Sequence, residues 1–231
     1  MTLFYPNISQ VYYFGVGDVD ECSIIAAFWA ARQAGFTGKL PTIREFRRAA
    51  GVPDRPGPTG LTTNQLWQGV SRTGLAVGAS ILSRGTTWAT FARKMQAGGA
   101  ASVALSSADL PVGYRYGFQG AHSVGLTWDK GQWYIANPLA PEGSGPQAIS
   151  EADIKRAVLA FGPNGSVQGV MFTVTGSSLA PVQTASVVKE DFNALKKRLA
   201  SVTGSSWAVD ARNVVSFYQA KHPMKDAGRR G

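Results

Sequence analysis

The chain has a single cysteine, Cys22, and the segment that follows it constrains the fold more than any other part of the sequence. Apolar residues of this segment recur at the spacing of one helical face: Ile24, Ile25, Phe28 and Ala31. Asp20 is the expected N-cap residue and Gly35 the expected residue after the C-cap, so the pattern predicts a helix with Cys22 in its first turn. At that position, exposed backbone N–H groups and the helix dipole favour the thiolate, which is the nucleophilic form of cysteine.

A β-hairpin is predicted farther along the chain. Residues 124–128 and 133–135 are rich in β-branched and aromatic side chains, and a short loop containing Gly131 joins them. His122 begins the first strand and Asn137 ends the second. Because the start of one antiparallel strand faces the end of the next, these two side chains are expected within hydrogen-bond reach. An amide oxygen against the imidazole would fix its tautomer and leave the other ring nitrogen to accept the Cys22 proton.

The remaining periodicity predicts helices in the first half of the chain and strands mainly in the second. Thr42 and Glu45 form a capping box that opens a short helix ending at Gly51. Further helices are predicted at residues 63–73 and 86–96, and further strands at residues 77–82, 101–105 and 167–174. This order predicts an α+β fold in which the cysteine helix packs on an antiparallel sheet, with a site in the cleft between them.

A cysteine at a helix start, a histidine at a strand start and Asn137-Pro138 one strand later resemble the papain-like cysteine peptidases. Among these, the chain is most similar to the C39-like peptidases of bacteriophage tail proteins and lysins. Residues 57–63 before a helix and the helix start at residues 150–153 match further local patterns of that group. The separation of 100 residues between Cys22 and His122 is shorter than the ~130–150 residues of papain and the cathepsins, which favours the compact bacterial relatives.

The resemblance implies a papain-like fold over roughly residues 10–175. It also implies a mechanism in which Cys22 is the nucleophile, His122 the acid and base, and Asn137 the residue that orients the imidazole. Hydrolysis of a peptide or amide bond would pass through an acyl-enzyme. A lone cysteine is usually a small buried apolar residue, so this interpretation depends on the three residues acting together.

The sequence offers several candidates for the oxyanion donor. Members of the group usually carry a glutamine about six residues before the cysteine, and this chain has Val16 there. Asp18 and Asp20 lie nearer to Cys22 and are near-site candidates, although a carboxylate donates a hydrogen bond only when protonated. Gln10 is the only upstream glutamine and lies far from the cysteine in sequence. The backbone N–H of Cys22 would supply part of the stabilisation.

Residue counts and missing motifs exclude several other kinds of site. Two histidines and one cysteine cannot build an ordinary Cys/His zinc site, and no P-loop, calcium-binding or complete dinucleotide-binding motif occurs. Neither a metal nor a cofactor is therefore expected. The sequence contains no run of about 18 apolar residues, so no membrane span is predicted. The first residues lack the features of a signal peptide. Synthesis in the host cytoplasm and, from the resemblance, a place in the virion as part of a phage tail are expected.

The composition predicts three parts: a peptidase domain at residues 1–175, a small polar linker at 176–188 and a basic helical C-terminal extension at 189–231. The extension has nine Lys and Arg against four Asp and Glu, so it carries +5 of the total charge of +9. This concentration predicts a partner with negative potential, such as another phage tail subunit or an anionic cell-wall polymer. Nucleic acid is a weaker candidate because no DNA-binding motif is present.

Two functions from different classes follow from these observations. The first is a cysteine peptidase or amidase of a phage tail or lysis system, with a protein or the peptides of peptidoglycan as substrate. The alternative is a virion structural or adaptor protein that retains a peptidase fold without activity. Val16, in place of the usual glutamine, and the basic extension motivate this alternative. A nucleic-acid-associated protein is a third hypothesis.

Overall fold

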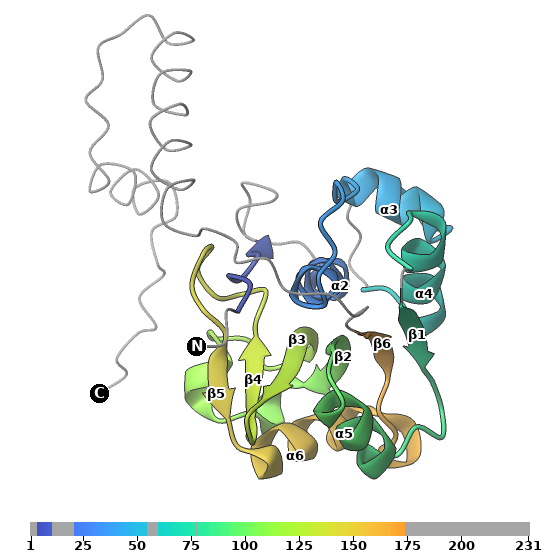
Figure 1. Cartoon of the computed structure of the whole chain (residues 1–231). Coiled ribbons are helices and arrows are strands. Elements are labelled where there is room, and N and C mark those ends of the chain that lie inside the picture. Colours follow the sequence, from blue (N-terminus) through green and yellow to red (C-terminus); the bar gives the residue numbers. More distant parts are fainter. Residues whose placement is uncertain (1–3, 11–20, 55–59, 77, 174–231) are drawn as a thin grey trace, which may run out of the picture. The chain divides into compact units, whose positions relative to one another are not determined.

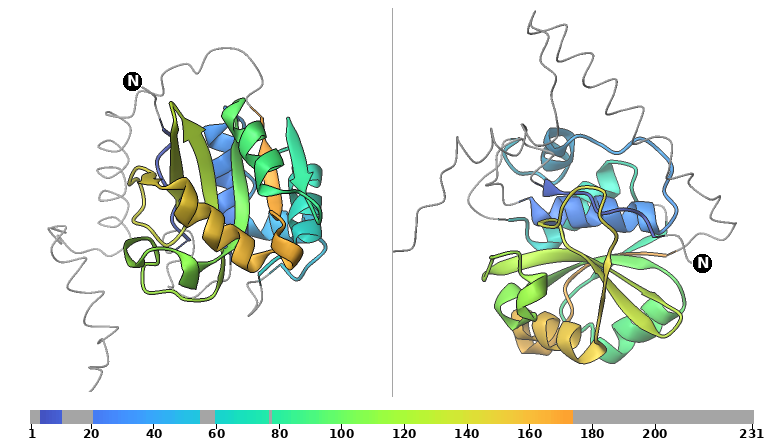
Figure 2. Two further views of the ribbon diagram at one scale, coloured as in Figure 1. Left: turned by 90° about the horizontal axis from the view of Figure 1, so that it is seen from below. Right: turned by 90° about the vertical axis from the view of Figure 1, so that its left-hand side faces the viewer.

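The computed structural model of the chain describes residues 4–10, 21–54, 60–76 and 78–173. Within these residues, an antiparallel sheet of six strands lies between two layers of helices (Figures 1 and 2). This mixed helix and sheet architecture agrees with the α+β fold predicted from the sequence. The predicted linker at residues 176–188 and the basic extension at 189–231 lie outside the described residues, and both stay predictions.

The sheet has the strand order β1-β6-β2-β3-β4-β5, and every neighbouring pair is antiparallel. The strands are β1 (Ala79–Leu82), β2 (Ala100–Ser106), β3 (Ala121–Asp129), β4 (Gln132–Ala136), β5 (Gln147–Ile149) and β6 (Gly169–Phe172). The predicted hairpin is confirmed as β3 and β4. Lys130 and Gly131 join the two strands with positive φ angles of 46° and 87°, which are typical of the tight turn that matches strand twist.

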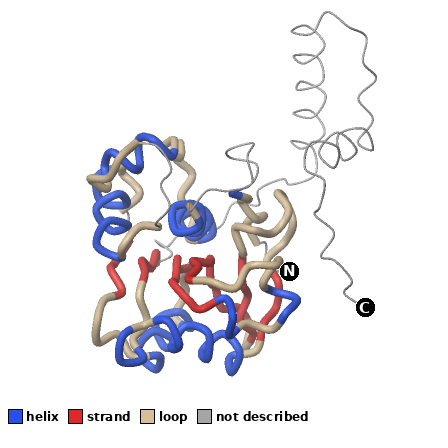
Figure 3. The backbone as a smooth tube through the Cα atoms, turned by 180° about the vertical axis from the view of Figure 1, so that it is seen from behind, coloured by secondary structure: helices blue, strands red, loops and turns tan. Residues whose placement is uncertain are grey.

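Two groups of helices cover the two faces of the sheet, as the tube view in Figure 3 also shows. Helices α2 (Cys22–Gln33), α3 (Ile43–Ala49) and α4 (Thr63–Arg72) lie on one face, and α5 (Trp88–Gln96) and α6 (Glu151–Phe161) on the other (Figure 1). Short 3-10 segments occur at Ser107–Asp109, Val112–Tyr114 and Pro163–Gly165. The predicted capping box of Thr42 and Glu45 is confirmed at the start of α3.

Helix α2 begins one residue later than the capping pattern predicts. Its N-cap residue is Glu21, so the assignment of Asp20 to that position was wrong. The Glu21 side chain makes no cap hydrogen bond, because its carboxylate contacts Arg47 of α3 instead. Cys22 is the first helical residue, as expected for the first turn, and Gly35 follows the C-cap with a left-handed φ of 97°.

The same helix is buried on all sides, and not only on the apolar face that its periodicity predicts. Every residue from Ser23 to Ala31 is buried. The sheet covers one side of α2, and the ring of Phe46 from α3 packs edge-on against Phe28, with 5.6 Å between ring centroids. Residues 4–10 cover a further part, where the Trp29 indole N–H donates to the Tyr5 carbonyl oxygen at 3.0 Å. The apolar stretch after Cys22 is therefore the central helix of the fold.

A close contact between Gly125 of β3 and Trp29 sets the distance between this helix and the sheet. A Cβ atom added at Gly125 would lie 2.2 Å from Cε3 of the indole, well inside van der Waals contact. Glycine is therefore required at this position because the tryptophan ring occupies the space of a side chain. This requirement places α2 directly above β3, the strand that contains His122.

We expect Gly125→Ala to lower the free energy of unfolding by about 1–3 kcal/mol, because the added methyl group overpacks the contact with Trp29. Urea denaturation followed by circular dichroism measures this change. Gly145→Ala is the matched control, since a Cβ atom there meets nothing within 4 Å. An equal loss of stability in both variants would contradict the role assigned to the contact.

Candidate active site

Cys22 lies at the start of α2, where the helix meets β2 and β3. It is partly exposed, whereas the nine residues after it are buried. The Ser102 hydroxyl of β2 donates to the Ser23 carbonyl oxygen at 3.2 Å and ties the helix start to the sheet. In an α-helix the N–H groups of the first residues have no partner within the helix. In α2 the first hydrogen bond of the helix runs from Ile25 N–H to the Glu21 carbonyl oxygen.

The expected contact between His122 and Asn137 is present. His122 is the second residue of β3, and Asn137 directly follows β4, so the hairpin brings the two together. His122 Nε2 and Asn137 Oδ1 are 2.9 Å apart, and both side chains are buried, with exposed fractions of 4% and 3%. The antiparallel pairing predicted this contact across 15 residues of sequence.

Backbone groups fix the orientation of the Asn137 amide. Its Oδ1 accepts a hydrogen bond from the Leu139 backbone N–H at 2.9 Å, and its Nδ2 donates to the Tyr114 carbonyl oxygen at 2.8 Å. The atom that faces the imidazole is therefore the amide oxygen, which can only accept. The neutral imidazole must carry its proton on Nε2, and this makes Nδ1 the acceptor nitrogen of His122.

Burial lowers the pKa of His122 below its usual value, because the imidazolium form loses hydration in this position. The hydrogen bond to Asn137 acts in the opposite direction and is the smaller effect. The Phe118 ring packs against the imidazole, with 5.5 Å between the two centroids, and adds to its apolar surroundings. His122 is thus held as a neutral base unless a negative charge lies beside it.

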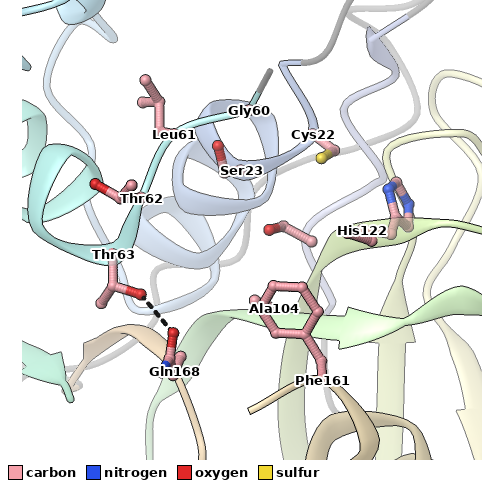
Figure 4. A pocket seen from close by; sticks show the side chains of 12 residues that line it. Cys22, Ser23, Gly60, Leu61, Thr62, Thr63, Ala104, His122, Phe161 and Gln168 are labelled. Carbon is pink, nitrogen blue, oxygen red and sulfur yellow. Dashed lines mark hydrogen bonds between the residues drawn. The ribbon is translucent and has the colours of Figure 1, made fainter. Parts of the chain in front are cut away.

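Cys22 and His122 line the same cavity, which has a volume of about 330 Å³ (Figure 4). Residues 60–63, Ala104 of β2 and Phe161 at the end of α6 form other parts of its wall. Among the described residues that line it, His122 and the Cys22 thiol are the only titratable groups. The volume falls in the range of small-ligand pockets, and the uncharged wall suits an uncharged peptide group.

Gln10 contacts the loop after Asn137, although its distance from Cys22 in sequence argued against a role. Its backbone N–H donates to the Pro138 carbonyl oxygen at 2.9 Å, directly after Asn137. The side chain is 9% exposed, and its Oε1 has no hydrogen-bond partner among the described residues. Segment 4–10 lies along the loop after β4, and the pairing of Asn7 with residues 143–145 also holds it there. The sequence carried no signal for this position of Gln10, because the burial of residues 7–10 arises from tertiary packing.

The other near-site candidates, Asp18 and Asp20, lie outside the described residues, as do Val16 and residues 57–59 of the local pattern before α4. Within the described ranges, no group of three or more His, Cys, Asp or Glu side chains could hold a metal ion. In the same ranges, no helix is long and apolar enough to span a bilayer.

No known protein-family profile matches the sequence, and no curated protein is significantly similar to it. Among solved structures, the fold is similar to the crystal structure of a protein from Bacillus anthracis inferred to be a C39-like peptidase. The two chains are 16% identical, with a TM-score of 0.50, over 75% of this chain and 96% of the other. At this identity the similarity shows a shared fold alone, and it supports the C39-like fold that the sequence resembles.

We expect the pKa of His122 to depend on the Cys22 thiol. In Cys22→Ala, burial should hold the pKa of His122 below its usual value of about 6.5. With Cys22 present, a thiolate would stabilise the imidazolium and raise the pKa of His122 above that of the alanine variant. NMR titration of the imidazole Cε1–H signal measures both values. His222→Gln in both backgrounds leaves His122 as the one histidine in the spectrum.

Stability should follow the same linkage in the Cys22→Ala protein. Because the folded-state pKa of His122 is depressed, its contribution to stability is present above about pH 6.5 and is lost as the pH falls through the folded-state pKa. Identical histidine titrations with and without Cys22 would contradict an interaction between the thiol and the imidazole.

Proposed function

We propose that this chain is a cysteine peptidase or amidase of the C39-like kind, with Cys22 as nucleophile, His122 as acid and base, and Asn137 as the residue that orients the imidazole. One observation carries the proposal. Cys22 and His122 line one cavity, while Asn137 holds the Nε2 proton and makes Nδ1 the nitrogen that accepts. A nucleophile, a base and a group that orients the base are the parts that nucleophilic catalysis at a carbonyl requires.

In the first half of the reaction, His122 Nδ1 takes the proton from Cys22 Sγ. The sulfur then forms a bond to the substrate carbonyl carbon, and the carbonyl π electrons move to its oxygen. When the tetrahedral intermediate collapses, the C–N bond breaks and the imidazolium proton passes to the leaving amine. The product is a thioester with Cys22.

In the second half, His122 accepts a proton from a water molecule, which attacks the thioester carbonyl. Collapse of the second intermediate breaks the C–S bond and releases the carboxylic acid. The His122 imidazolium then gives its proton to the Cys22 thiolate, which restores the resting state. The Cys22 backbone N–H at the start of α2 is one donor to the oxyanion. We propose the Gln10 side-chain amide as the second donor, because this residue is held beside Asn137-Pro138.

For the substrate, we propose a peptide or amide bond, with the peptides of peptidoglycan as the first candidate. The support is the sequence resemblance to the C39-like domains of phage tail proteins and lysins. In that setting the chain would be a virion component that opens the cell wall locally. The basic residues 189–231 would then dock on other tail subunits.

The proposal predicts that Cys22 in the native protein reacts rapidly with iodoacetamide well below pH ~8.5, the value of an ordinary thiol. His122→Ala should remove this reactivity, and Asn137→Ala should slow it by about tenfold because the tautomer is no longer held. The measurement is the rate of alkylation as a function of pH, with the denatured protein as reference. Labelling that stays slow until denaturation would mean a core thiol and would favour the inactive adaptor.

Hydrolysis is tested on purified cell-wall sacculi and on peptide mixtures by the appearance of new amino groups. We expect Cys22→Ala to abolish the release while the protein remains folded. Binding to sacculi that is unchanged in Cys22→Ala, together with no release by the natural protein, would favour the adaptor.

The role of Gln10 predicts that Gln10→Ala lowers kcat by about 100-fold, as is typical for loss of one oxyanion donor, while alkylation of Cys22 stays unchanged. Gln33→Ala is the matched control, since Gln33 Oε1 accepts a hydrogen bond from Tyr5 N–H and anchors the same segment. Equal losses of kcat in the two variants would mean that Gln10 only supports the structure of segment 4–10.

A further inference from the structure

A buried ion pair lies directly before the nucleophile. Glu21 Oε1 and Arg47 Nη1 are 2.5 Å apart, and the two side chains are 0% and 4% exposed. Arg48, which follows Arg47 in α3, forms an ion pair at the surface. Its distance to Asp54 is 3.7 Å, and both side chains are largely exposed. Of these two pairs, only the first is removed from solvent and connects α3 to the start of α2.

Both ends of the buried pair are held by further contacts. Arg47 Nε donates to the Pro53 carbonyl oxygen at 2.6 Å, so the guanidinium bridges the carboxylate and the loop after α3. At the other end, the Glu21 carbonyl oxygen accepts the first hydrogen bond inside α2, from Ile25 N–H at 3.0 Å. A planar guanidinium suits such a bridge because its donors lie on separate nitrogens, whereas a lysine carries all its donors on one nitrogen.

Glu21 and Cys22 are consecutive, and their side chains go to different parts of the molecule. The Glu21 carboxylate reaches α3, while Cys22 lines the cavity that it shares with His122. Replacing a buried ion pair by apolar residues is often neutral for stability, so stability alone is a weak reason for this pair. Its directional hydrogen bonds, however, define where the first turn of α2 begins.

We propose that the Glu21–Arg47 pair positions Cys22 by tying the first turn of α2 to α3, so that the thiol stays within reach of His122. This inference rests on the proposed function, in which Cys22 is the nucleophile. Glu21 and Arg47 are positioning residues, because neither lines the cavity. Arg47 on α3 is itself anchored, since its neighbour Phe46 is fully buried.

The test compares Glu21→Met/Arg47→Met with the unaltered protein by hydrogen exchange. The double variant should fold, since apolar side chains of similar size replace a buried pair. We expect the amides of residues 22–28 to exchange about tenfold faster or more, and those of 29–33 to keep their protection. Arg48→Gln is the matched control and should change neither segment. Arg47→Lys serves if the double variant does not fold, because it keeps the charge but lacks the two separate nitrogens that contact Glu21 and Pro53.

A second readout separates positioning from a general structural role. In the unaltered protein, His122→Ala should slow the alkylation of Cys22 by about tenfold or more at pH 7. In the Met/Met background, the same substitution should change the rate by no more than about twofold, because the thiol and imidazole are no longer coupled.

Unchanged exchange at residues 22–28 would overturn the inference. Faster exchange with the full effect of His122→Ala retained would also overturn it, since the pair would then stabilise the helix start without positioning the thiol. If alkylation of the unaltered protein does not depend on His122, the proposed function fails. Hydrogen exchange then decides alone whether the pair holds the first turn.

Discussion

The contact between Trp29 and Gly125 is the constraint on which the site depends, because it sets how closely α2 approaches the sheet. A side chain at residue 125 would push the helix away from β3, and Cys22 and His122 belong to these two elements. The helix is also covered by α3, α4 and residues 4–10, so it has little freedom to move along the sheet. In the proposed function, a nucleophile at the partly exposed start of an otherwise buried helix would combine access for a substrate with a fixed position.

Asn137 has a comparable role for the histidine. Its oxygen accepts from both Leu139 N–H and His122, and its amide group donates to the Tyr114 carbonyl oxygen. One buried side chain thereby links the end of β4, the segment before β3 and the imidazole. Because two of these partners are backbone groups, the state of the imidazole is set by the fold of the chain. A single amide can therefore hold the imidazole in the tautomer whose Nδ1 is the acceptor.

Much of the fold could be predicted because its signals are local. The spacing of Ile24 and Phe28 marked the helix after Cys22, and the tight turn at Gly131 marked the hairpin that joins His122 to Asn137. The failures concern contacts across long stretches of sequence. Burial of α2 on every side, the pairing of Glu21 with Arg47 and the place of Gln10 beside Pro138 all arise from tertiary packing, which periodicity does not encode. The N-cap assignment also failed, since the helix begins at Cys22 with Glu21 as its N-cap residue, and the Glu21 carboxylate contacts Arg47 and makes no cap hydrogen bond.

The burial of His122 favours the proposed catalytic site over a purely structural role for this residue. An asparagine that accepts a hydrogen bond two residues on is a common turn element, so Asn137 alone has a structural explanation. Burying an imidazole against it, however, removes hydration from a group that titrates near neutral pH and depresses its pKa. In an inactive adaptor, this desolvation penalty at a cavity wall would serve no reaction. In the proposed peptidase, a Cys22 thiolate would supply a counter-charge in the same cavity, and this charge would couple the titrations of the thiol and the imidazole.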